Sequence, residues 1–482
     1  MKILSVNTFA TSRLCVIISR CLSYTTLTLI SFCAFANTDS TSKIVVRSVQ
    51  IVGLQKTRLN VIEREYSVHE GDTLSKNELE KKVELDRQKI WNTNLFLTLQ
   101  PKISIDSSNQ ADILYTVKER FYILALPVIS LADRNFNEWW YDRGRDFGRL
   151  IYSIHGTYDN FTGRRDKLRI RAEFGFIPRL EISYQRPYID KAQKTGYTIG
   201  ITRIVNRNLA YRTNADKLVF LGVENRTRER IVPFFTLQHR PKFYGTHYLG
   251  VSYSRSKLSD TIASLNTNYF LNGQTKQNYV QLAYTYLYDR RDNSQYPLLG
   301  KVWSVQVVRS GVLPSDNVNI WESTINWAEF KPLSKRWFFS YNAEAKVSAP
   351  LRQPFLQTRG LGYFNDLVRG YELYVIDGQH YAYAHTNLRY KLFDRVFKLK
   401  FLNRLKQFNA LPITVYPNVY LDAGYVKNYY PEINNSKLAN RTLVGGGIGL
   451  DFVTWYNFVL RLNYSTNHLG EWRPYFSIGR EF

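Results

Sequence analysis

The most constraining feature of this chain is the alternation of apolar and polar side chains from about residue 121 to the C-terminus. Segments of roughly 8 to 13 residues repeat this alternation, and turns containing Gly, Asn or Asp separate them. In Leu168–Phe176 the Leu, Ile, Ala and Phe side chains share one face, while Arg and Glu share the other. Tyr456–Tyr464 shows the same pattern. The alternation predicts β-strands with one apolar and one water-facing side, as in a soluble sandwich or a membrane barrel.

Three features favour the membrane barrel. Charged and amide residues fill the polar face along whole strands, as a water-filled lumen permits. Aromatic residues cluster near the expected strand ends, at Trp139–Tyr141, Tyr429–Tyr430 and Trp455–Tyr456, which suits a girdle at the membrane interface. The segments number about sixteen, and a sheet in lipid has to close because unpaired backbone finds no water there. We therefore predict an all-β transmembrane barrel of about sixteen antiparallel strands over residues 121–482; a soluble multi-sheet protein is the alternative.

The first 36 residues have the organisation of a signal peptide. A basic stretch precedes an apolar run that ends at Ala34-Phe35-Ala36, the small-x-small pattern of signal peptidase sites. We expect cleavage before Asn37, and an amphipathic N-terminal anchor is the alternative. All three cysteines lie in this segment: Cys15, Cys21 and Cys33. The mature chain would therefore hold no disulfide and no thiolate metal site.

Residues 43–119 mix strand and helix patterns and predict a separate α+β domain. Ile44–Val52 is rich in β-branched residues, and Leu97–Ile105 and Ala111–Val117 are two further strands. Two helical segments lie between the first strand and the second. The predicted order of elements is β-α-α-β-β.

The two helices of this domain have recognisable starting residues. We expect Thr57 to cap a short helix that ends near Tyr66. Ser75 precedes Glu78 by three residues, the spacing of a capping box, and opens a polar helix that runs to about Asn92.

Motifs in the barrel region carry a family resemblance. Val368, Arg369, Gly370 and Tyr371 form one motif in a long stretch between strand-like segments, and Asp422 and Gly424 belong to a strand. A strand-and-turn element is formed by Asp289, Arg291, Asp292, Asn293, Pro297 and Gly300. With the β-α-α-β-β domain, these motifs resemble the BamA/TamA superfamily of outer-membrane assembly and two-partner secretion barrels, whose periplasmic POTRA modules bind polypeptides. The resemblance implies that Arg369 lies at the tip of extracellular loop six and Asp422 in the barrel wall.

The last residues resemble the C-terminal assembly signal of outer-membrane barrels. That signal ends on an aromatic residue and places aromatic and aliphatic side chains on one strand face. The matching residues here are Phe476, Ile478, Gly479 and Phe482.

Alternation along the Asp422 strand places this carboxylate with Tyr420 in the lumen, because Val419 and Leu421 share the apolar face. A lone carboxylate facing lipid would be costly. A loop folded back into the lumen would bring Arg369 to Asp422, and a guanidinium pairs with a carboxylate through two parallel hydrogen bonds. An ordinary Arg-Gly turn and an unrelated strand Asp are the alternative.

In the family, the barrel closes where the first strand meets the last, and that seam opens sideways into lipid. The first strand is expected at Phe121–Leu131 or Leu150–His155, and the last at Trp472–Phe482. Pro474 removes a ladder donor from the last strand and Gly479 removes side-chain packing, which fits an incompletely paired seam. A kink at the start of the strand explains Pro474 equally well.

The family also implies how a client is received. An exposed strand edge of the POTRA-like domain would pair with an unfolded chain by β-augmentation. We expect this client-binding edge at Lys102, Ile103, Ser104, Ile105 and Asp106. The sequence contains one such module, which fits a dedicated or accessory role as well as a general one.

The sequence therefore predicts an outer-membrane protein of a Gram-negative bacterium that inserts or translocates polypeptide clients, with its POTRA-like domain in the periplasm. A two-partner-secretion exporter of one substrate, or a passive porin or receptor, is the alternative. No nucleophile, phosphate-loop or metal-ligand motif is present, so we expect no enzyme activity, cofactor or metal. The formal net charge of +25 falls to +22 without the three basic residues of the signal peptide, and this balance favours an anionic lipid surface or an acidic partner over nucleic acid. Lipopolysaccharide and accessory lipoproteins are further candidate partners.

Overall fold

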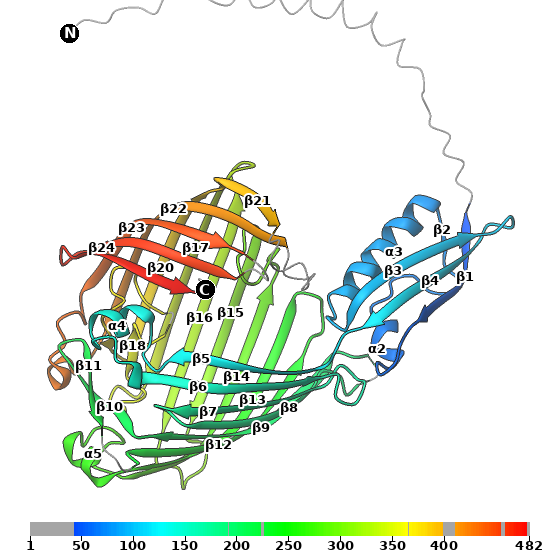
Figure 1. Cartoon of the computed structure of the whole chain (residues 1–482). Coiled ribbons are helices and arrows are strands. Elements are labelled where there is room, and N and C mark those ends of the chain that lie inside the picture. The colour runs from blue at the N-terminus through cyan, green and yellow to red at the C-terminus, as the bar shows by residue number, and fades with distance from the viewer. Residues whose placement is uncertain are drawn as a thin grey trace, which may run out of the picture. The chain divides into compact units, whose positions relative to one another are not determined.

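The computed structural model describes residues 43–190, 192–222, 226–364, 366–398, 410–454 and 458–479. The predicted signal peptide and Phe482 lie outside these residues. The chain forms two compact units (Figure 1). The first comprises residues up to Gly53 and Glu65–Lys118, and the second comprises Leu54–Arg64 and Glu119 to the C-terminus. No helix in the described part of the chain has the length and apolarity needed to span a membrane.

The first unit is a small α+β domain. Its strands are β1 (Ile44–Val52), β2 (Thr73–Leu74), β3 (Phe96–Ile105) and β4 (Gln110–Glu119), which form one sheet in the order β2-β1-β4-β3. Helix α3 (Lys76–Trp91) buries Leu79, Val83 and Ile90, and Figure 1 shows it along one face of the sheet. This arrangement confirms the predicted POTRA-like fold.

The capping box predicted at the start of α3 is present. The Ser75 hydroxyl accepts the N–H of Glu78, and the Glu78 carboxylate accepts the N–H of Ser75. The predicted role of Thr57 is wrong, because helix α2 (Asn60–Glu63) begins after Leu59 without a side-chain cap. The Thr57 hydroxyl instead bonds to the side chains of Tyr122 and Asn160.

The second unit is a closed antiparallel barrel. β20 and β21 both pair with β22 and act as one interrupted strand, so the wall has sixteen strand positions, as predicted. The barrel strands are β5 (Ile123–Leu131), β6 (Leu150–Asp159), β7 (Lys167–Gly175), β8 (Arg179–Arg186), β9 (Thr195–Asn206), β12 (Arg228–His239), β13 (Gly245–Leu258), β14 (Lys276–Asp289), β15 (Gly300–Ser310), β16 (Ile320–Pro332), β17 (Trp337–Ala349), β20 (His380–Tyr390), β21 (Phe393–Lys398), β22 (Ala410–Lys427), β23 (Thr442–Val453), β24 (Val459–Asn467) and β25 (Trp472–Ile478).

Shorter elements lie in the connections between the barrel strands. β10 (Asn208–Asn214) and β11 (Lys217–Gly222) form a hairpin, and β18 (Arg359–Leu361) pairs with β19 (Ile376–Asp377). The helices are α4 (Phe136–Tyr141) and α5 (Asp260–Leu265), with short 3₁₀ turns at Phe147–Arg149 and Pro431–Asn434.

The two faces of the wall differ as the alternation requires. On β22, Val419 and Leu421 are 51% and 61% exposed on the outer face, whereas Tyr420 and Asp422 are buried on the inner face. An outer wall of exposed Leu, Ile, Val and aromatic side chains is costly in water and favourable in lipid. The period-2 pattern therefore predicted both the strands and the face that each side chain occupies.

One aromatic cluster is not at a strand end. Trp139–Tyr141 lies in helix α4, whose first turn is capped by Asn135: its Oδ1 accepts the N–H of Glu138 at 2.8 Å. This cluster therefore lies in the connection between β5 and β6 and not within a strand. Tyr429–Tyr430 follows the end of β22 as expected, and Trp455–Tyr456 lies outside the described residues.

Asp86 offers a test of the POTRA-like fold. Its fully buried carboxylate accepts hydrogen bonds from the Ser67 N–H (2.7 Å), the Ser67 hydroxyl (2.6 Å) and the Val68 N–H (3.2 Å). Asp86→Ala leaves these buried donors without their acceptor. We therefore expect the free energy of unfolding of residues 43–119 to fall by about 2–4 kcal/mol in urea titrations followed by circular dichroism. The control Glu84→Ala removes an exposed helix pair with Arg87 and should change it by no more than about 0.5 kcal/mol; equal effects would contradict this account.

Candidate functional site

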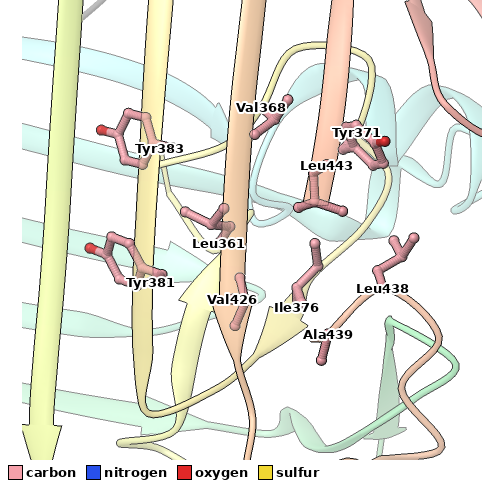
Figure 2. Close-up of a cluster of buried hydrophobic side chains, with 10 residues drawn as sticks. All are labelled: Leu361, Val368, Tyr371, Ile376, Tyr381, Tyr383, Val426, Leu438, Ala439 and Leu443. Carbon is pink, nitrogen blue, oxygen red and sulfur yellow. The ribbon is translucent and has the colours of Figure 1, made fainter. Parts of the chain in front are cut away.

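Loop six, residues 350–379 between β17 and β20, folds against the inner wall of the barrel. Its tip residues Val368 and Tyr371 are 1% and 2% exposed. Figure 2 shows both residues beside Leu443 of β23. They belong to a buried apolar cluster that includes Leu361, Val368, Tyr371, Ile376, Tyr381, Tyr383, Val426, Leu438, Ala439 and Leu443.

The tip of loop six is tied to β22 by Arg369. Its Nε donates to Oδ2 of Asp422 at 2.7 Å and its Nη2 donates to Oδ1 at 2.5 Å, so the two groups form parallel hydrogen bonds. The backbone N–H of Arg369 donates to the same carboxylate at 3.1 Å. The structure thus brings together two residues that lie 53 positions apart in sequence.

The rest of the guanidinium also has partners. Nη1 donates to Oδ1 of Asn387 at 2.6 Å, and Nη2 donates to the carbonyl of Thr386 at 3.1 Å. The guanidinium carbon lies 3.9 Å from the ring centre of Tyr420, a cation–π contact. Nε2 of His385 lies 3.8 Å from Oδ2 of Asp422. Every side of the guanidinium is therefore used, which fixes its position on the wall.

Two glycines allow this close approach. A Cβ at Gly424 would lie 2.5 Å from a methyl carbon of Val368, and one at Gly445 would lie 1.8 Å from the carbonyl oxygen of Arg369. Both positions face the loop from neighbouring strands β22 and β23. A side chain at either position would push the tip of loop six off the wall.

Gly370 and Tyr371 complete the tip. Gly370 has φ +98°, a backbone conformation that favours glycine, and its carbonyl accepts Nδ2 of Asn467 at 2.8 Å. The Tyr371 hydroxyl contacts Nδ1 of His468 and donates to the carbonyl of Val444 at 3.3 Å. The four-residue motif therefore contacts both β22 and the β23–β24 wall.

Glu372 follows the motif and carries a perturbed carboxyl group. Burial is the main cause that raises its pKa from 4.5 to about 8, and the nearby Asp422 adds to the rise. The N–H of Gly370 donates to Oε2 of Glu372 at 2.8 Å, and the Arg369 guanidinium also opposes the rise. Near neutral pH this carboxyl is therefore mostly protonated beside the ion pair.

The strand-and-turn motif forms the connection between β14 and β15. β14 ends at Asp289, β15 begins at Gly300, and Pro297 lies between them. Arg291 donates to both carboxylate oxygens of Asp289, at 2.9 and 2.6 Å.

The interior of this turn is closed by its own side chains. Oδ1 of Asp292 accepts the N–H of Leu299 at 3.1 Å, and Oδ1 of Asn293 accepts the N–H of Gln295 at 2.7 Å. The hydroxyl of Tyr296 donates to Oδ2 of Asp451 on β23 at 2.8 Å. These contacts fix the turn and do not reach the Arg369 site.

The last described strand, β25, lies next to β5 in the closed barrel, at the first of the two predicted starting strands. Phe476 and Ile478 lie in β25, and Gly479 follows it. The carbonyl of Pro474 accepts the hydroxyl of Tyr141 at 3.1 Å, on the side away from β24. Because the N and O of one strand residue point to the same side, the donor that Pro474 lacks faces the seam and costs the β24–β25 ladder nothing.

Pro474 is the third residue of β25. It stands where sheets tolerate proline, with its nitrogen toward an edge.

The predicted client-binding edge lies mainly in β3, which the sheet order places at an edge. Lys102–Ile105 is within this strand. Asp106 is not: its Oδ1 accepts the N–H groups of Ser108 and Gln110, at 3.0 and 2.9 Å. Its carboxylate therefore closes the β3–β4 turn.

Sequence reasoning missed several partners of the loop. Alternation gave a signal for His385 and Asn387, which are both buried and lie two positions apart on β20. It gave no signal for Arg134 and Asn135, whose contacts with loop six depend on the path of the β5–β6 connection.

Comparisons with known proteins agree with this architecture. Residues 160–482 match the Omp85 superfamily domain, and residues 44–120 match the POTRA family described as a surface antigen variable number repeat. The chain therefore belongs to the Omp85 superfamily, and it is an outer-membrane barrel of a Gram-negative bacterium with a periplasmic POTRA domain. Comparison with curated protein sequences gives no match.

Solved structures show the same fold. BamA from Haemophilus ducreyi lacking POTRA domains 1–3 has a TM-score of 0.59 and 17% identity, covering 90% of this chain and 84% of that chain. CdiB from Escherichia coli has a TM-score of 0.54 and 13% identity, covering 90% and 75%. At these identities the similarity concerns the fold.

Removal of one partner from the Arg369–Asp422 pair should destabilise the barrel. Arg369→Ala leaves a buried carboxylate unpaired, so we expect a loss of about 3–5 kcal/mol in urea unfolding of the detergent-solubilised protein, followed by tryptophan fluorescence. Arg369→Lys should recover little, since an ammonium cannot form the two parallel bonds. The control Arg291→Ala breaks a partly exposed pair and should cost about 1 kcal/mol or less.

Ionisation of Glu372 should loosen loop six at alkaline pH. Its pKa is higher in the folded protein than in the unfolded chain. The stability that the protonated carboxyl gives the folded protein is therefore fully present below pH 4.5 and is lost as the pH rises through about 8. Proteinase K cleavage of loop six should therefore accelerate between pH 6 and pH 9 in the wild-type protein. Glu372→Gln, assayed at each pH to cancel the protease's own profile, should remove this acceleration; an unchanged profile would contradict the assignment.

Proposed function

We propose that this Omp85 protein inserts polypeptide clients into the outer membrane or translocates them across it. In this proposal the periplasmic POTRA module receives the unfolded client, and the seam between β25 and β5 releases it sideways into lipid. The protein acts by mechanical opening of the wall and uses no reactive group.

The observation that carries the proposal is the β25 edge at the seam. Pro474 presents no N–H there, and its carbonyl is satisfied by a tyrosine side chain instead of a neighbouring strand. The backbone groups of Phe476 likewise bond to the side chain of Asn137. Side-chain contacts hold part of the wall at this position. Separating them costs less free energy than separating a continuous ladder, because each contact forms outside the cooperative hydrogen bonding of a sheet.

Loop six favours an assembly or translocation barrel over a passive porin. Its tip is held against the inner wall by the Arg369–Asp422 pair, which a passive porin or receptor does not predict. We assign the attachment the task of holding the inner wall beside the seam in one geometry, since Arg369 contacts β20 and β22 while Tyr371 contacts the β23–β24 wall.

The POTRA module supports client capture. β3 is an edge strand of four-stranded sheet β2-β1-β4-β3, so Lys102–Ile105 can offer backbone groups to an extended chain. This mode reads backbone more than side chains and suits clients of many sequences. Outer-membrane lipid, lipopolysaccharide and accessory lipoproteins are proposed as further partners.

Depletion of the protein, followed by quantitative proteomics of the outer membrane, tests this function. We expect β-barrel proteins to fall together, and complementation with Arg369→Ala or Asp422→Ala to restore them poorly although the precursor is still exported. Complementation with Arg291→Ala should restore them.

The other outcomes are equally informative. Loss of one secreted protein alone would indicate a dedicated exporter of the two-partner-secretion kind. Unchanged levels of every outer-membrane and secreted protein would reject the proposal in favour of a pore or receptor.

A further inference from the structure

The connection between β5 and β6 places helix α4 directly on the edge of β25. Oδ1 of Asn137 accepts the N–H of Phe476 at 2.9 Å, and Nδ2 of Asn137 donates to the carbonyl of Phe476 at 3.1 Å. One carboxamide thus satisfies both backbone groups of one strand residue. A neighbouring β-strand would make the same pair of hydrogen bonds.

Two further contacts hold α4 at this edge. The Tyr141 hydroxyl donates to the carbonyl of Pro474 at 3.1 Å, and the Phe136 ring packs edge-on against Phe476 with ring centres 5.3 Å apart. Pro474 has no N–H and needs no acceptor, so α4 has to satisfy only its carbonyl. The helix therefore matches the hydrogen-bonding groups of this stretch of β25.

The residues that precede α4 contact loop six. Arg134 donates through Nη1 to the carbonyl of Tyr374 at 3.1 Å and also to that of Gly362. Nδ2 of Asn135 donates to the carbonyl of Glu372 at 2.8 Å. Loop six and β25, which do not share a strand pair, are therefore joined through one short segment.

Buried ion pairs make this segment stiff. Arg134 pairs with Glu138 at 2.7 Å, and Arg143 pairs with the same carboxylate at 2.6 Å. Arg149 pairs with the fully buried Asp133 at 2.6 Å. Arg134 therefore contacts both loop six and Glu138 of α4, which gives a continuous path of contacts from the loop to the helix.

An apolar cleft of ≈ 440 Å³ opens beside the α4–β25 contact. It is lined on one side by Phe136 and Trp140 of α4 and on the other by Leu450, Leu462 and Tyr464, which are on the lipid-facing side of β23 and β24. Backbone groups that are satisfied by side chains instead of a strand, next to an apolar, lipid-facing cleft, fit an extended segment whose alternate side chains are apolar.

We propose that α4 is a releasable latch on the seam: Asn137 occupies the β25 edge at Phe476 until loop six moves, and a membrane β-strand of a client then pairs there. This inference rests on the proposed function for its choice of partner. The latch and its coupling to loop six through Arg134 and Asn135 stand on the contacts above.

Hydrogen–deuterium exchange on the full-length protein in detergent micelles tests the latch without any client. Asn137→Ala should raise the exchange rate of peptides covering Trp472–Ile478 about tenfold, as expected for the loss of a hydrogen bond. Asn137→Asp, which keeps the size and the acceptor but sets a carboxylate against the Phe476 carbonyl, should have a similar effect. Unchanged exchange of β25 in both variants would overturn the latch.

The coupling of loop six to β25 is tested with Arg134→Ala, because Arg134 contacts loop six and does not contact β25. Exchange should rise in β25 as well as in loop six. The matched control is Arg145→Ala in the same connection, whose guanidinium lies over the Trp140 ring at 4.0 Å; it should leave β25 unchanged. A rise confined to loop six in Arg134→Ala would overturn the coupling.

The partner is tested with a reversible lock. Phe136→Cys and Phe476→Cys are joined by a short, reducible thiol cross-linker in a chain whose natural cysteines all precede residue 34. The locked protein should fail to assemble a radiolabelled barrel client in liposomes, and reduction should restore assembly. If the locked and unlocked proteins both assemble the client normally, the client-strand proposal is overturned and the proposed function stands. If neither form assembles any client, the proposed function fails, and the exchange data still decide whether α4 is a latch.

Discussion

The absence of water inside a bilayer is the constraint on which this structure depends, because every backbone N–H and C=O in the wall then needs a partner within the protein. Sixteen strand positions satisfy it by closing into a barrel. At the β25 edge beside α4, side chains take the place of a strand for some of the described residues. There a proline removes one donor, and Asn137 and Tyr141 satisfy the remaining groups at Pro474 and Phe476. The wall is closed, but at this edge by groups that can leave without unzipping a ladder.

The second organising contact is the attachment of loop six. A buried guanidinium and a buried carboxylate gain little net stability from each other, since each loses its hydration. What they supply is position: the Arg369 fork fits only where Asp422, Asn387 and Tyr420 surround it. Small residues at Gly424 and Gly445 make room for that position. The same loop meets Arg134 and Asn135, so the lumen and the seam are parts of one connected assembly.

Much of the site could be predicted because two kinds of information are local in sequence. Alternation placed Tyr420 and Asp422 on the inner face, and the family resemblance suggested that a loop folded back into the lumen would bring Arg369 to Asp422. The capping box at Ser75 was equally local. The prediction for Thr57 was wrong because its surroundings come from elsewhere in the chain: Thr57 meets Tyr122 and Asn160. The helix that holds Trp139–Tyr141 and is capped by Asn135 was not predicted.

The sequence by itself determined the strands, the face each side chain occupies, the α+β module and the membership of an outer-membrane assembly family, because periodicity and short motifs act over neighbouring residues. Only the tertiary structure decided what satisfies the seam. Asn137 and Phe476 are 339 positions apart, and no periodicity relates a helix in the first loop to the last strand. Closure of the barrel brings the two ends of the sheet together, and only then does a carboxamide lie where a strand would be.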